Sequence, residues 1–230
     1  MDLPVYVVHY TPLKERKIYM DEQFKKYNID ATYMTDYDRE DLTEDDLKRF
    51  GKKEDGSMCI KMSEISLACK QMAIYKEIIN KNIEAAVIFE DDVTLFDDFL
   101  AKFMMYYYDL PDDWDILFFG SGWNLHVPEK LVKESNTNIF LKGNNGVGRW
   151  SVEVYRDGWP VCGGSTRCLD SYIIRNRAAK KIMDVVGKSE IRHAFDLYLN
   201  QVFRSLNLKI YWGEPSLCKQ DTFESSLKCK

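Results

Sequence analysis

Some segments of the chain have the short apolar runs typical of strands, and others have the apolar residues three or four positions apart that are typical of helices. The alternation of these two kinds of segment predicts an α/β fold. Short runs of apolar and β-branched residues predict strands at 5–8, 31–35, 85–89, 115–119, 171–174 and 209–212, with 151–155 as a further candidate. Longer stretches with apolar residues three or four positions apart predict helices at 13–27, 65–79, 176–186 and 193–206, and a short helix is expected after Thr43.

The run 85–89, Ala-Ala-Val-Ile-Phe, is apolar at every position, which is typical of a strand buried on both faces. Because the predicted strands alternate with helices, we expect a mostly parallel central sheet flanked by helices. The length of 230 residues is compatible with one domain or two small ones, and we predict a single catalytic domain over 1–230.

Composition narrows the class of protein further. A hydrophobic fraction of 45% and an aromatic fraction of 13% exclude a disordered chain, and a net charge of -5 argues against nucleic acid as a partner. No apolar segment reaches the roughly 20 residues of a membrane helix, and the N-terminus has no secretory signal pattern. Six cysteines without a CxxC pair favour reduced thiols, so we expect a soluble cytoplasmic protein, with a Cys162–Cys168 disulfide as the alternative.

Three consecutive acids, Glu90, Asp91 and Asp92, follow the apolar run 85–89 directly. Open α/β sheets bind ligands at the carboxyl ends of their strands, so this is a favoured place for chemistry. Adjacent carboxylates repel one another, and a hard cation such as Mn²⁺ or Mg²⁺ would neutralise them and hold a diphosphate. The alternative is a solvated turn whose acids cap a following helix.

Five segments together carry a resemblance to a known family. They are Val7-Val8-His9-Tyr10 with Arg16, Ser63-Glu64-Ile65, the run 85–93 containing the acids, Leu110 to Gly120, and a C-terminal group of Ala178-Ala179-Lys180-Lys181, Asp196-Leu197-Tyr198-Leu199 and Ile210 to Leu217 with Gln220. In this order and spacing they resemble glycosyltransferase family 25, which includes bacterial lipooligosaccharide galactosyltransferases and procollagen galactosyltransferases. The resemblance covers nearly the whole chain.

The resemblance implies a GT-A type fold and inverting transfer of a hexose, galactose or glucose, from a UDP-sugar to a hydroxyl of a glycan or polypeptide acceptor. It also implies Mn²⁺ or a similar ion, with Asp91 and Asp92 as the metal-binding carboxylates. The resemblance places Arg16 near the nucleotide and Gln220 beside the site, and we expect both to bind the donor together with Glu90 and His9. For His9, which lies at a strand end, satisfied burial is the alternative.

Asp196 is the candidate catalytic base, because inverting transfer requires a group that takes the proton of the acceptor hydroxyl. It lies between apolar residues and matches a family position. The alternative is that Asp196 is a helix N-terminal carboxylate favoured by the helix dipole.

Lys70-Gln71 departs from the Ser-His pair usual in the family, and His9 stands where an asparagine is usual. These departures keep open a glycan- or nucleotide-binding protein without turnover. A metal-dependent nucleotidyltransferase is a second alternative. The absence of glycine in Tyr10-Thr11-Pro12-Leu13-Lys14 argues against a phosphate-binding loop after the first strand.

Overall fold

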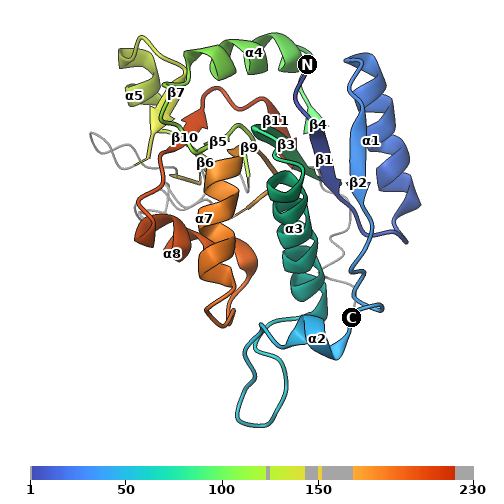
Figure 1. The fold of residues 1–230 in the computed structure, drawn as a ribbon. Coiled ribbons are helices and arrows are strands. Elements are labelled where there is room, and N and C mark those ends of the chain that lie inside the picture. The colour runs from blue at the N-terminus through green and yellow to red at the C-terminus, as the bar shows by residue number, and fades with distance from the viewer. Residues whose placement is uncertain (1, 123–124, 143–149, 152–167, 221–230) are drawn as a thin grey trace.

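The computed structural model describes residues 2–122, 125–142, 150–151 and 168–220. Within these residues a seven-stranded sheet has the order β2-β1-β3-β9-β5-β10-β7 (Figure 1). Its strands are β1 Val5–Val8, β2 Ala31–Met34, β3 Ala85–Glu90, β5 Ile116–Phe118, β7 Ile139–Leu141, β9 Ser171–Arg175 and β10 Ile210–Gly213.

Five of the seven strands run in one direction. β1 is parallel to β2 and to β3, and β5 is parallel to β10. β9 is antiparallel to both β3 and β5, and β7 is antiparallel to β10. The sheet is therefore mixed but mostly parallel, as the alternation of strands and helices predicted.

Helices cover both faces of the sheet. The longer ones are α1 Lys14–Lys26, α3 Met62–Asn80, α4 Phe99–Asp109, α7 Asn176–Val186 and α8 Phe195–Ser205, and the short ones are α2 Glu44–Leu47 and α5 Glu129–Glu134. Among the described residues, no helix has both the length and the apolar character needed to cross a membrane.

Alternation along the strands divides the core into two parts. Tyr6 and Val8 of β1 face the cluster that contains buried residues of α3, α7 and α8, whereas Val5 and Val7 face the cluster with α1 and α4. Figure 1 shows α3 and α7 side by side against the sheet. The result is a three-layer α/β arrangement.

β3 lies at the centre of this arrangement, between β1 and β9, and its residues 85–89 are buried. Val8 of β1 pairs with Glu90, so the two parallel strands end at the same edge of the sheet. The chain after β1 and the acids after β3 consequently emerge side by side.

The segments after the acids differ from the sequence-based expectation. Asp92 is followed by the strand β4 Val93–Leu95, which pairs antiparallel with β11 Cys218–Gln220, and a helix begins only at Phe99. α4 was not predicted, although Phe99, Phe103 and Tyr106 have helical spacing. Of the candidate strand 151–155, only Ser151 lies among the described residues, in β8 Trp150–Ser151, which pairs with β6 Leu125–His126.

The packing around Phe89 generates a stability prediction. Its fully buried ring lies 5.6–6.0 Å, centroid to centroid, from those of Phe24, Phe99 and Phe119. Phe89→Ala should lower the free energy of unfolding by about 3–5 kcal/mol, because it removes apolar contacts and leaves a cavity. Phe96→Ala, at a ring that is 36% exposed, is the control. Equal losses for both variants in denaturant titration would contradict this account of the core.

Candidate functional site

Asp91 is held by three groups at the end of β3. Its Oδ2 lies 2.7 Å from Nδ1 of His9 and accepts a hydrogen bond from the backbone N–H of Tyr10 at 3.3 Å. Its Oδ1 accepts from Nη1 of Arg16 at 2.9 Å. The parallel pairing of β1 with β3 brings His9 and Tyr10 here, and α1 then carries Arg16 back over the acids.

Asp92 shares Arg16 with Asp91 and is also bonded to Gln220. Nη1 of Arg16 donates to Oδ2 of Asp92 at 3.2 Å, and Nε2 of Gln220 donates to Oδ1 at 3.3 Å. The same Gln220 nitrogen donates to Oε2 of Glu90 at 3.2 Å. Gln220 reaches the acids because β11 pairs with β4, where it lies opposite Val93.

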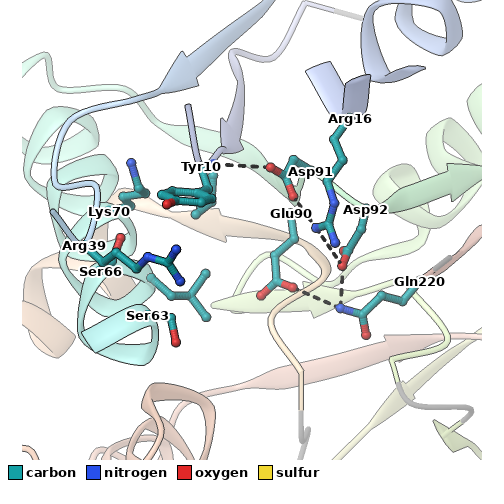
Figure 2. A pocket seen from close by; sticks show the side chains of 12 residues that line it. Tyr10, Arg16, Arg39, Ser63, Ser66, Lys70, Glu90, Asp91, Asp92 and Gln220 are labelled. Carbon is teal, nitrogen blue, oxygen red and sulfur yellow. Dashed lines mark hydrogen bonds and ion pairs between the residues drawn. The ribbon is translucent and has the colours of Figure 1, made fainter. Parts of the chain in front are cut away.

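A pocket of about 640 Å³, including solvent at its mouth, opens beside these residues. Its lining consists of Val8, Tyr10, Arg16, Arg39, Ser63, Ser66, Leu67, Lys70, Glu90, Asp91, Asp92 and Gln220. Figure 2 shows the three acids with Arg16 and Gln220 on one side, and Tyr10, Arg39, Lys70 and two serines on the other.

Five of the seven predicted site residues therefore line one pocket: Arg16, Glu90, Asp91, Asp92 and Gln220. His9 is 2% exposed and contacts the pocket through Asp91 instead of lining it.

Burial shifts the titration of the acids. It raises the pKa of Glu90 well above the usual range, and the charges of Asp92, Asp170 and Asp91 add to the shift. Burial also raises the pKa of Asp92 to about 6; Arg16 opposes this shift and Asp91 adds to it. Burial and the neighbouring carboxylates together disfavour the ionised forms of Glu90 and Asp92.

Asp196 lies in the first turn of α8, outside the pocket lining. Its Oδ1 accepts a hydrogen bond from the backbone N–H of Leu197 at 2.7 Å, an arrangement compatible with a helix N-terminal role. Its negative charge also contributes to the raised pKa of Glu90, so it belongs to the electrostatic surroundings of the acids. Both interpretations of Asp196 remain compatible with its position.

Asp170 is an acid of this site that sequence reasoning missed. It is 2% exposed, and its backbone carbonyl accepts a hydrogen bond from the N–H of Glu90 at 2.8 Å. A Cβ at Gly120 would lie 2.0 Å from Oδ2 of Asp170, so only glycine leaves room for this carboxylate. In the sequence, Asp170 is an acid directly before an apolar strand. It lies near Glu90 because β9 runs antiparallel beside β3, so the start of β9 is next to the end of β3.

Within the described part of the chain, no group of three or more His, Cys, Asp or Glu side chains is arranged to hold a metal ion. The carboxylate oxygens of Glu90 and Asp92 are nevertheless the donors that hard divalent ions prefer. Their pKa values are raised mainly by burial, and the neighbouring carboxylates add to the shift.

Comparison with known proteins assigns the class of the chain. The sequence model of glycosyltransferase family 25 (LPS biosynthesis protein) matches residues 2–199. The chain therefore belongs to glycosyltransferase family 25, which confirms the family expected from its motifs and supports a glycosyltransferase.

Two other comparisons add nothing to this assignment. No curated protein matches the chain significantly. Among solved structures the chain is similar to the crystal structure of A197 from STIV, with 12% identity and a TM-score of 0.38 over 92% of this chain and 81% of that one. A likeness at this level carries no argument.

Because the pKa of Asp92 is raised, replacing its carboxylate by a neutral amide should stabilise the folded protein to an extent that depends on pH. A carboxyl group whose pKa is higher in the folded state favours folding below its unfolded pKa, near 3.9, and loses that contribution as the pH rises through about 6. Asp92→Asn should therefore raise the free energy of unfolding at pH 7 by on the order of 2 kcal/mol.

The gain should largely disappear near pH 3.5, where Asp92 is mostly protonated in both states. Denaturant titrations at the two pH values test this, with Asp97→Asn at an exposed position as the control. A destabilised Asp92→Asn protein at pH 7 would show that the charge of Asp92 is fully compensated.

Proposed function

We propose that this protein is an inverting, metal-dependent glycosyltransferase with a GT-A type fold. It transfers a hexose, galactose or glucose, from a UDP-sugar to a hydroxyl of a glycan or of a hydroxylated polypeptide side chain. The observation that carries the proposal is the pocket at the ends of β1 and β3, where three acids meet Arg16 and Gln220. Family membership over 2–199 supports the reaction class.

The two sides of the pocket suit the two parts of such a donor. The acidic side, with its excess of carboxylates, suits a cation that carries the diphosphate. The opposite side offers the ring of Tyr10, the guanidinium of Arg39 and the side chains of Ser63 and Leu67. Aromatic, cationic and hydroxyl groups of this kind suit a nucleoside.

Asp91 and Asp92 are the proposed metal-binding carboxylates, with Glu90 beside them. When bound, Mn²⁺ or Mg²⁺ supplies positive charge that stabilises the departing diphosphate. In this structure Arg16 is the positive charge that Asp91 and Asp92 share. With a cation held by Asp91 and Asp92, the guanidinium of Arg16 would lie close enough to the same site to donate to a phosphate oxygen of the donor.

His9 and Gln220 are proposed to orient the acids. His9 and the Tyr10 N–H fix Oδ2 of Asp91, and Gln220 holds Glu90 and Asp92 through a single nitrogen. Asp196, whose charge acts on Glu90, is the proposed base that takes the proton of the acceptor hydroxyl.

Asp92→Asn tests the role of the acids in donor binding. It should abolish Mn²⁺-dependent release of UDP from UDP-glucose or UDP-galactose, because a neutral amide binds the cation more weakly than a carboxylate does. Calorimetric titration with Mn²⁺ and UDP should show the same loss, whereas Asp97→Asn should behave as wild type. Normal turnover in Asp92→Asn would remove the acids from the mechanism. A wild-type protein that binds neither Mn²⁺ nor UDP would favour the alternative without turnover.

Asp196→Asn separates the two interpretations of Asp196. As a base, Asp196 contributes roughly 10²-fold or more to the transfer rate, and the amide should remove this while UDP affinity stays normal. As a helix N-terminal residue, it is replaced well by Asn, so transfer should persist. Transfer rate, UDP affinity and thermal stability measured on the same variant decide between them, and a near-normal rate would refute the base assignment.

A further inference from the structure

Lys70 is a buried lysine in the middle of α3 that lines the pocket. Its side chain is 2% exposed, and a buried ammonium is costly unless it is paired. Its Nζ donates to the backbone carbonyl of Asp36 at 2.6 Å, to Oδ1 of Asp38 at 2.7 Å and to the carbonyl of Met34 at 3.5 Å. These three acceptors all lie at or just after the end of β2.

Asp38 extends this connection to the chain after β1. It is 6% exposed, and its two oxygens accept from the backbone N–H of Thr11 at 3.4 and 3.3 Å. Thr11 also donates through Oγ1 to the carbonyl of Thr35 at 3.4 Å. One ammonium group thereby joins α3 to the segments that leave both β1 and β2.

These two segments carry the wall of the pocket opposite the acids. Tyr10 precedes Thr11, and Arg39 follows Asp38. The Arg39 guanidinium lies 5.0 Å from the centroid of the Tyr10 ring, and both side chains bond Oε1 of Glu40, at 2.5 Å from Arg39 and 2.8 Å from Tyr10. Figure 2 shows Lys70 beside Tyr10 on this side of the pocket.

A neighbouring contact from α3 adds a second attachment. Ser66, one turn before Lys70, donates through Oγ to the carbonyl of Tyr37 at 2.6 Å. Lys70 differs from it in placing a full positive charge against Asp38. The lysine ammonium has three N–H donors, one for each of the two carbonyls and the carboxylate. A neutral side chain of similar size does not offer this combination of donors and charge.

We propose that Lys70 is a positioning residue of the donor pocket: by binding the segment 34–38 and, through Asp38, the backbone of Thr11, it holds Tyr10 and Arg39 in place for the nucleoside part of the donor. The proposal rests on the proposed function, since it assigns the nucleoside to this wall.

Lys70→Met is the principal test, because methionine keeps an unbranched apolar chain and removes the charge and the donors. The KM for the UDP-sugar and the Kd for UDP should rise about tenfold or more, while kcat at saturating donor stays within about threefold. The affinity for Mn²⁺ alone should change less than the affinity for UDP, because Asp91 is held by His9 and Arg16 as well as by the Tyr10 N–H. Hydrogen exchange at the amides of 10–11 and 36–40, measured without nucleotide, should accelerate.

Two further variants complete the experiment. Asp38→Asn keeps an acceptor for Lys70 but loses the charge, so it should change KM and exchange in the same direction to a smaller extent, and it remains informative if Lys70→Met does not fold. Lys76→Met makes the same chemical change at an exposed position of α3 and should behave as wild type. Unchanged KM in a folded Lys70→Met protein, or equal exchange in Lys70→Met and Lys76→Met, would overturn the proposal. If wild-type protein binds no UDP with Mn²⁺, the proposed function fails on its own, and exchange alone then decides whether Lys70 holds this wall.

Discussion

The repulsion among Glu90, Asp91 and Asp92 at the end of β3 is the constraint around which the site is built. Asp91 and Asp92 are buried and Glu90 is half-buried; burial raises the pKa of Glu90 and of Asp92, and the charges of the neighbouring carboxylates add to both shifts. Arg16 is the cation that relieves part of this repulsion, and it does so by bonding two of the acids at once. Arg16 reaches the acids from α1, which also packs against the sheet through Met20 and Phe24.

Because burial raises the pKa of Asp92, its negative charge opposes folding at neutral pH. Arg16 and Gln220 lower this pKa, but they do not offset the effect of burial. On the other side of the pocket the buried charge is paired, because the ammonium of Lys70 donates to one carboxylate and two backbone carbonyls. The pocket therefore has one side formed by three acids and another side on which the buried ammonium of Lys70 is paired.

Local sequence signals were sufficient for much of the site. The apolar run 85–89 followed by three acids predicted both the buried strand and the charged edge, and the family motifs added Arg16 and Gln220 to the same place. The sequence analysis missed Asp170 because this residue precedes its strand. An acid at the N-terminal end of a strand lies near the site only if that strand runs antiparallel to β3, as β9 does. Lys70 was recognised only as a departure from the family; its acceptors are 32 to 36 residues earlier in the chain.

The sequence by itself determined the α/β class, most strands and helices, and the acidic edge of β3, because hydrophobic spacing and turn residues act over a few neighbouring positions. Only the tertiary structure decided that β9 inserts antiparallel between β3 and β5, that β11 pairs with β4, and that Gln220 therefore meets Glu90. These arrangements depend on which strand edges and helix faces pack best against one another across long sequence separations. Which of the possible pairings forms depends on the packing of the whole chain, so a local sequence pattern does not predict it.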